Sequence, residues 1–158
     1  MISPSKPTLI RNKSERGQSL VEFTFGAIVL IVLLVGMVDF GRAFYTYVAL
    51  RDAAQEGAVY GSICPKNAAN IEQRVRTSSS EPVDLTDTTH VKVTCRYVAN
   101  NAACGSGSVP TPGTGIRVAV EYDDFMITMP FLGGLIGRQS ITIRAEVEDT
   151  ILRDIICP

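Results

Sequence analysis

One uncharged stretch constrains this chain more than any other feature of its sequence. Residues 23–38 read FTFGAIVLIVLLVGMV and contain no charged side chain. Together with Leu20 and Val21, the stretch approaches the roughly 20 apolar residues with which a helix spans a bilayer. A single carboxylate, Glu22, lies at its N-terminal end. Because a charge costs roughly 2.5–3.5 kcal/mol at the bilayer centre and less near the interface, Glu22 needs a partner of opposite charge.

The charges on either side of the stretch predict its orientation. Four basic residues and one acidic residue precede it, whereas the first charges after residue 38 are nearly balanced. The positive-inside rule then places the N-terminus in the cytoplasm and everything after about Asp39 outside. The basic residues are Lys6, Arg11, Lys13 and Arg16.

Three interpretations of the stretch compete. A signal peptide is disfavoured, because the stretch is too long and no small-x-small cleavage site follows it. An uncleaved membrane anchor is the plainest interpretation. The third is a hydrophobic stem that stays in the mature protein after a cut on the cytoplasmic side, between Gly17 and Gln18. Glu22 would then be residue five of the mature chain, and the new α-amino group of a neighbouring subunit would supply its opposite charge.

Several segments together resemble a known family. They are RGQSLVEF at residues 16–23, the apolar stretch, DFGRA at residues 39–43 and AAQEGA at residues 53–58. In these segments the chain resembles the TadE/TadG-like pseudopilins of the tight-adherence (Flp) branch of type IV pilus systems, over about residues 16–61. The resemblance implies processing by a membrane prepilin peptidase and a minor role in pilus assembly, with other pilin subunits and the assembly platform as partners. The chain departs from the family in lacking a proline within the membrane helix.

The helical pattern continues beyond the membrane. No proline occurs between Gln18 and Gly61, and bulky residues recur at spacings of three and four after Asp39. Pro65 then prevents continuation. We therefore predict one helix over residues 18–61, with the membrane span at about residues 20–38. Its small residues fit two interpretations, close packing on the chain's own sheet and contact between subunits; they are Gly26, Gly36, Ala53, Ala54, Gly57 and Ala58.

Residues 62–158 are enough for one small extracytoplasmic domain. Apolar and polar residues alternate over residues 90–99, 116–122 and 140–148, which predicts three half-buried strands. With one polar face, an antiparallel meander is the simplest sheet, and the outer half of the long helix can cover its apolar face. The pattern predicts an α+β, pilin-like fold. A short helix over residues 71–76, started by Asn70, is also expected.

The connection over residues 124–137 is unusually apolar for a loop. We expect it to fold over one end of the sheet, since apolar runs are usually core. The alternative is an exposed patch at residues 130–134 for another subunit or the membrane surface.

All four cysteines lie on the side predicted to be outside. An even number in an extracytoplasmic domain indicates two disulfides. Four cysteines allow three pairings, and the sequence does not choose among them. We favour Cys95–Cys104, which would pin a loop to its strand, and Cys64–Cys157, which would tie the C-terminus to the end of the helix.

Other classes of function find little support. Removing a 17-residue leader with four basic residues and one acidic residue leaves 11 basic and 15 acidic residues, a net charge of −4 without a basic stripe for nucleic acid. With one histidine, His90, and wide cysteine spacing, zinc is disfavoured. The acidic residues near the strand ends lack the spacing of a calcium loop, and we interpret them as a solvated rim: Glu121, Asp123, Asp124, Glu146, Glu148 and Asp149.

The sequence therefore predicts a non-enzymatic pseudopilin of the inner membrane, with no cofactor, metal or small-molecule substrate. It would cross the membrane once, be cut after Gly17 and join or support a pilus through its apolar helix, with Glu22 setting its register against a neighbour. The alternative is an uncleaved, membrane-anchored binding or accessory domain of the cell envelope, in which Glu22 is a tolerated interfacial acid.

Overall fold

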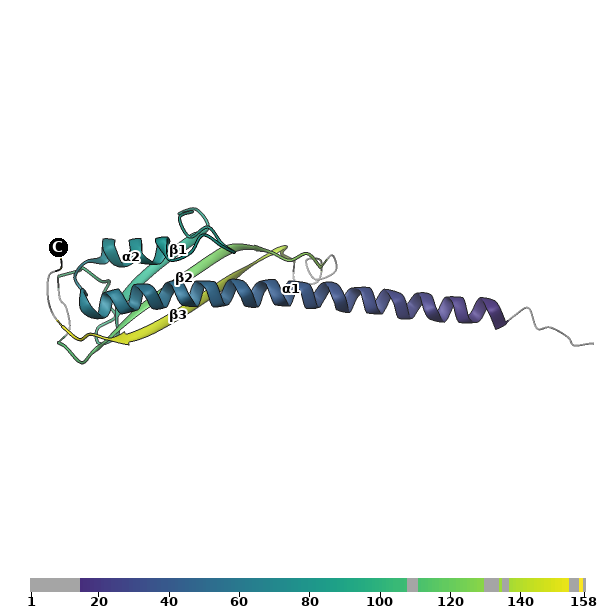
Figure 1. Cartoon of the computed structure of the whole chain (residues 1–158), viewed down its shortest axis with the longest axis horizontal. Helices are drawn as coiled ribbons and strands as arrows, with labels where there is room; N and C mark the ends of the chain where they lie inside the picture. Colours follow the sequence, from purple (N-terminus) through teal and green to yellow (C-terminus); the bar gives the residue numbers. More distant parts are fainter. Residues whose placement is uncertain (1–14, 108–110, 130–133, 135–136, 154–156, 158) are drawn as a thin grey trace, which may run out of the picture.

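A computed structural model describes residues 15–107, 111–129, 134, 137–153 and 157 of the chain, with side chains from residue 17 onward. Its dominant element is helix α1, Glu15–Ile63, which contains 49 residues and is about 70 Å long at 1.5 Å per residue. The first half of α1 projects beyond the rest of the molecule, and the second half lies against a sheet (Figure 1). The helix begins three residues before the predicted start and ends two residues after the predicted end, immediately before Cys64 and Pro65.

The sheet has three antiparallel strands in the order β1-β2-β3. They are β1, Val91–Tyr97, β2, Gly115–Met126, and β3, Ser140–Thr150. Val93 pairs with Val120 and Val120 with Ala145, so the apolar faces predicted for the three strands coincide. The structure confirms the α+β fold of one long apolar helix and a three-stranded antiparallel sheet.

Strand β2 is longer than predicted. The alternating pattern indicated an end at Tyr122, but the pairing with β3 shifts register between Tyr122 and Phe125 and then continues to Met126. A register shift of this kind breaks the alternation of inward and outward side chains, so a pattern search stops there. The extra residues carry the β2–β3 pair toward the projecting half of α1 (Figure 1).

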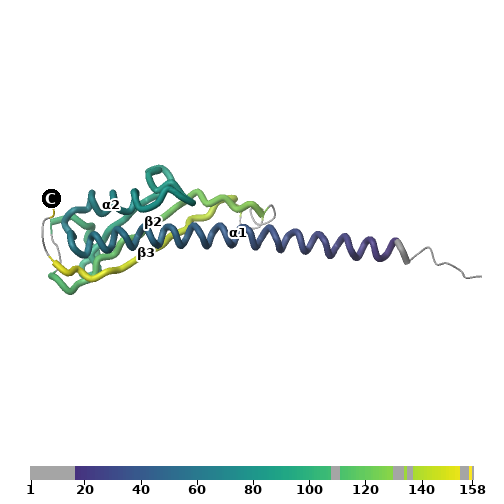
Figure 2. Tube along the Cα trace, viewed as in Figure 1, coloured from purple at the N-terminus to yellow at the C-terminus, as the bar shows by residue number. Residues whose placement is uncertain are grey.

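The core lies between the outer half of α1, helix α2 (Ala68–Thr77) and the sheet (Figures 1 and 2). Gly57 and Gly61 permit the close approach, since an added Cβ would lie 2.5 Å from Val75 Cγ2 at the first position and 2.7 Å from Ile116 Cδ1 at the second. The small residues at this height therefore pack on the chain's own sheet and on α2. Buried core residues include Leu50, Ala53, Ala54, Ala58, Ile71, Tyr97, Val118, Val120 and Ala145.

Helix α2 begins earlier than predicted, at Ala68. Its N-cap is Asn67, whose side-chain oxygen accepts the backbone N–H of Asn70 at 3.2 Å. Asn70 itself lies inside the first turn and donates from its side chain to the hydroxyl of Tyr60 at 3.2 Å. The cap is therefore Asn67 and not the predicted Asn70, and its side chain satisfies one of the free backbone donors of the first turn.

Candidate functional site

The projecting half of α1 is the most unusual surface of the molecule. Its large apolar side chains point outward on every side, with Phe23 76% exposed and Met37 73% exposed. Within the described residues, α1 is the one helix long and apolar enough to cross a membrane, and its most apolar 18-residue window has a mean hydropathy of 2.5 with none of it buried. This apolar half fits a single-pass membrane protein.

The predicted cleavage junction lies in the first turns of α1. Gly17 and Gln18 are exposed, and a Cβ placed on Gly17 would meet no other atom within 4 Å. Glu22 is exposed one helical turn beyond Gln18. In the part of the chain that the structure describes, no side chain forms an ion pair or hydrogen bond with Glu22. Residues 1–14 of the expected leader lie outside the described residues.

A polar contact marks the point where the apolar stretch ends. Asp39 is only 7% exposed, and its Oδ2 accepts the backbone N–H of Met129 at 2.8 Å. Arg42, one turn further, donates from Nη1 to Thr128 Oγ1 at 2.8 Å and lies 3.7 Å from Asp39 Oδ1. The guanidinium of Arg42 also lies 5.5 Å from the centre of the Phe125 ring. These contacts fasten the end of the β2–β3 pair to the helix.

The pKa of Asp39 reflects this environment. Burial raises the pKa, but the hydrogen bonds from Met129 and Thr128 and the nearby charge of Arg42 together lower it by more. The pKa therefore lies below the ordinary value for aspartate. Asp39 is therefore ionised at neutral pH. Sequence reasoning missed this contact; the available signal was a charged residue directly after an apolar run in a continuous helix.

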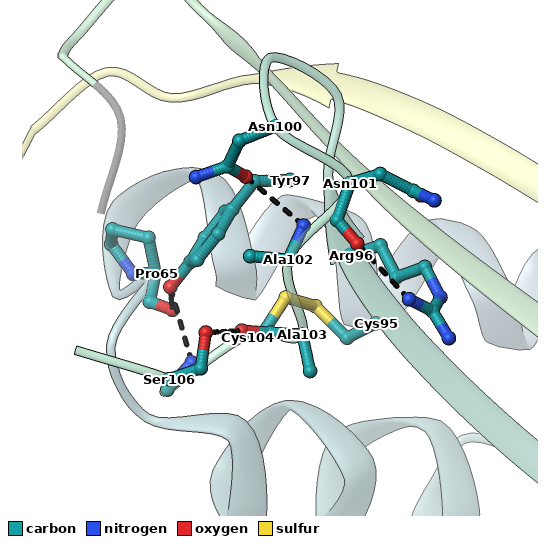
Figure 3. The surroundings of a disulfide bond; sticks show 11 residues. Pro65, Cys95, Arg96, Tyr97, Asn100, Asn101, Ala102, Ala103, Cys104 and Ser106 are labelled. Atoms are coloured by element: carbon teal, nitrogen blue, oxygen red, sulfur yellow. Dashed lines mark hydrogen bonds between the residues drawn. A yellow bond between two sulfur atoms is a disulfide. The ribbon is translucent and has the colours of Figure 1, made fainter. Parts of the chain in front are cut away.

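The structure joins Cys95 to Cys104 and Cys64 to Cys157, with Cα–Cα separations of 5.4 and 5.7 Å. These are the two pairs that the sequence favoured. Figure 3 shows the first pair beside the buried Tyr97, whose hydroxyl donates to Pro65 O at 2.8 Å. The same hydroxyl accepts the Gly105 N–H at 3.1 Å. Together these bonds hold the β1–β2 connection against the end of α1.

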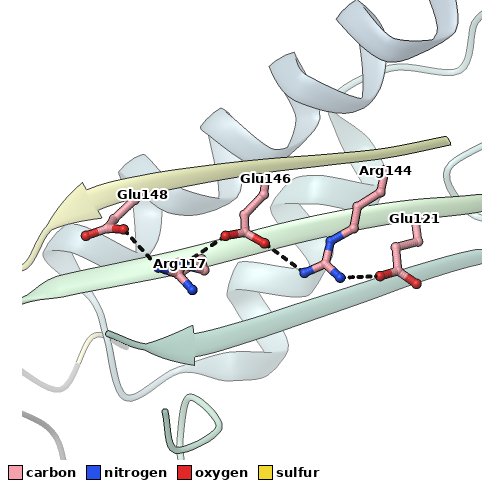
Figure 4. A network of polar contacts seen from close by, with 5 residues as sticks. All are labelled: Arg117, Glu121, Arg144, Glu146 and Glu148. Carbon is pink, nitrogen blue, oxygen red and sulfur yellow. Dashed lines mark hydrogen bonds and ion pairs between the residues drawn. The ribbon is translucent and has the colours of Figure 1, made fainter. Parts of the chain in front are cut away.

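Three of the acidic residues near the strand ends, Glu121, Glu146 and Glu148, are paired with arginines. On the open face of the sheet, Arg117 contacts Glu146 at 2.9 Å and Glu148 at 3.3 Å, and Arg144 contacts Glu146 at 2.7 Å and Glu121 at 2.9 Å (Figure 4). Such half-exposed pairs contribute roughly 0–1 kcal/mol each. They also place charges on the edge strand β3, which discourages pairing with another sheet.

Asp123 is paired in a similar way at the end of β2. Hydrogen bonds from Lys92 and His90 hold its pKa below the ordinary value. Asp124 and Asp149 lie on β2 and β3, both half-buried. No group of three or more His, Cys, Asp or Glu side chains among the described residues is placed to hold a metal ion.

A groove of about 600 Å³ lies between α1 and the segment that follows α2. Its charged lining residues are Asp52, Glu56, Arg74 and Glu81. The hydroxyls along it, from Thr77, Ser78 and Ser79, donate to backbone carbonyls. None of these three hydroxyls is therefore aligned with a general base, as nucleophilic catalysis requires.

Comparison with known proteins points to the same helix. Residues 17–59 match the family model described as TadE-like protein. No curated protein and no solved structure matches the chain significantly. The matched segment contains Gly17, Glu22, the apolar half of α1 and Asp39, and it stops four residues before α1 ends. The family suggests a protein associated with Tad pilus systems, whose TadE-like members are structural. The resemblance found in the sequence is thus confirmed: over residues 17–59 this chain is similar to TadE-like proteins.

Proposed function

We propose that the chain is a pseudopilin, a minor pilin-like subunit for assembly of a tight-adherence type IV pilus. The observation that carries this proposal is the projecting half of α1, which leaves an apolar surface uncovered on every side. Such a surface needs lipid or other apolar helices around it. A pilus subunit meets both in turn, first in the membrane and then among its neighbours.

The proposed orientation places the N-terminus in the cytoplasm and the sheet domain outside. The excess of basic residues before α1 supports it through the positive-inside rule. The two disulfides of the sheet domain support it independently, because disulfides persist in oxidising compartments.

Processing between Gly17 and Gln18 is the next part of the proposal. A glycine in a helix is roughly 1 kcal/mol less favourable than alanine. Packing among the described residues does not require one at position 17, where an added Cβ would have no atom within 4 Å. A requirement imposed by another protein, such as a prepilin peptidase, accounts for its presence.

Glu22 would then set the register between subunits. After cleavage Gln18 carries a new α-amino group, and the exposed carboxylate of Glu22 on a neighbouring subunit can pair with it. An apolar environment strengthens the attraction, although burying both charges offsets much of the gain. Such a pair is therefore suited to fixing an axial offset rather than to adding stability.

Assembly of variant subunits in cells tests this function. Glu22→Ala should be inserted and cut normally but should fail to enter or support pili, and Glu22→Gln should fail as well because it keeps the shape without the charge. Glu56→Ala, which removes an exposed carboxylate from the outer half of the same helix, is the matched control and should assemble normally. Normal piliation with Glu22→Ala would refute the register role.

A second candidate is an uncleaved, membrane-anchored accessory domain of the envelope. One observation favours it: α1 runs without interruption across the Gly17–Gln18 bond, whereas proteases generally require extended backbone at the cut. In that case Gly17→Leu would leave the mass of the membrane-bound chain unchanged apart from the substitution itself.

A further inference from the structure

The end of the β2–β3 pair lies beside the start of the apolar half of α1. Beyond the last paired residue of β2, the Ile127 N–H still donates to Gln139 O at 3.0 Å, so the hairpin pairing continues. Two residues later the Met129 N–H donates to Asp39 on α1. The hairpin therefore reaches the helix at the first residue after the apolar stretch.

The side chain of Met129 reaches further along α1. A Cβ added to Gly36 would lie 3.6 Å from Met129 Cε and 3.9 Å from its Sδ. Gly36 precedes Asp39 by three residues, or about 4.5 Å along the helix axis. It belongs to the uncharged stretch that ends at Val38. Met129 therefore lies level with the last turn of that stretch.

We propose that this end of the hairpin, formed by Met126, Ile127 and Met129 with Arg42 beside them, contacts the lipids of the outer leaflet. The proposal rests on the membrane span proposed for α1. Lipid is the expected partner because the hairpin end is continuous with the apolar surface of the helix. If residues 20–38 lie in the hydrocarbon core, Met129, which lies level with Gly36, is at the boundary of that core.

The chemistry of the hairpin end suits that position. Met126 is 60% exposed and carries no charge, and the thioether side chains of Met126 and Met129 adapt to irregular apolar surroundings. The amides of Ile127 and Met129 are both hydrogen-bonded. This matters because an unpaired amide in lipid costs several kcal/mol.

Arg42 supplies the polar half of the contact. It lies one turn further from the membrane than Asp39 and is exposed, with its guanidinium near the Phe125 ring and bonded to Thr128. A guanidinium whose stem lies along an apolar surface can reach lipid phosphates while its carbon atoms stay in the interface.

The chain contains no tryptophan, so a single introduced tryptophan reports on its own position. The full chain is reconstituted in phosphatidylcholine vesicles with and without lipids brominated on the acyl chains, which quench nearby indole fluorescence. The reporters are Met129→Trp and, at a more exposed position that disturbs less packing, Met126→Trp. Leu33→Trp reports on the membrane span itself, and Leu152→Trp, at a 66% exposed residue at the opposite end of the domain, is the control.

We expect Met129→Trp and Met126→Trp to be quenched roughly threefold or more above Leu152→Trp, because the bromines lie only in a hydrocarbon core about 30 Å thick. Quenching of both at the level of Leu152→Trp, with Leu33→Trp strongly quenched, would overturn the lipid contact while leaving the membrane span intact. If Leu33→Trp were not quenched either, the span would fail and the lipid contact with it.

Discussion

The contact between Asp39 and Met129 gives the sharpest prediction of local stability. Asp39→Leu removes the acceptor and leaves the Met129 N–H without its partner at a nearly buried site. A hydrogen bond to a charged group contributes about 1.5–3 kcal/mol. Because each 1.36 kcal/mol is a factor of ten, the Met129 amide should exchange with solvent roughly 10- to 150-fold faster in the variant.

Hydrogen exchange on the full chain in lipid nanodiscs measures this effect. Asp39→Asn keeps an acceptor oxygen but loses the charge, so its effect should be smaller, since neutral hydrogen bonds are about half as strong. Asp52→Leu, on an exposed part of the same helix, is the control and should leave the Met129 amide unchanged. Unchanged exchange at Met129 in Asp39→Leu would show that the Asp39 carboxylate does not stabilise the end of the hairpin.

The same contact should respond to pH in a defined direction. Burial raises the pKa of Asp39, but the hydrogen bonds from Met129 and Thr128 and the charge of Arg42 together outweigh it. The pKa is therefore lower in the folded chain than in the unfolded chain, where it is about 3.9. The stabilisation is then complete above the unfolded value and is lost as the pH falls through the folded value. Protection of the Met129 amide, corrected for intrinsic exchange, should be constant from about pH 7 to 5 and should decrease below about pH 4. Loss of protection already near pH 6 would contradict this account.

Three further predictions concern the outer domain and can be checked by chemical unfolding in detergent. Gly57→Ala should destabilise the domain by about 1–3 kcal/mol, because the new Cβ collides with Val75 of α2. Gly41→Ala is the control: its Cβ meets open space, so it should stabilise the helix by up to about 1 kcal/mol. Equal effects of the two substitutions would contradict close packing at Gly57. Tyr97→Phe should cost about 1–3 kcal/mol because the buried Pro65 carbonyl and the Gly105 N–H both lose the hydroxyl, and a neutral effect would show that water replaces it. Cys157→Ser should cost more than Cys104→Ser, about 5 against about 3 kcal/mol from loop closure over 93 and 9 residues; the reverse order would contradict the loop-closure argument.

Much of the fold followed from periodicity. Alternation over 7 to 10 residues located all three strands, and the absence of proline located the long helix. Both patterns arise from local geometry, so a sequence records them directly. Gly61 was the predicted last residue of the helix, yet the helix continues to Ile63. Both Gly57 and Gly61 lie inside it and admit side chains from α2 and β2. That role depends on tertiary packing, which no local pattern records.

The candidate site likewise contains features that are local in sequence and features that depend on tertiary packing. The TadE-like helix could be recognised from its residues, since Gly17, Glu22 and the apolar stretch are contiguous in sequence. The Asp39 contact joins residues 90 positions apart, and its existence depends on how far β2 extends past its register shift. The apolar connection after Asp124 was expected to fold over one end of the sheet. Phe125 is buried as expected, Met126 is exposed, and residues 130–133, 135 and 136, with most of the alternative patch, lie outside the described residues.

The most direct test of the central claim is the intact mass and N-terminal sequence of the protein from membranes of cells that carry the cognate prepilin peptidase. The account predicts a chain that begins at Gln18, and a Gly17→Leu chain that keeps its leader. A wild-type chain that still begins at Met1, beside a peptidase active on another substrate, would contradict processing as a pseudopilin.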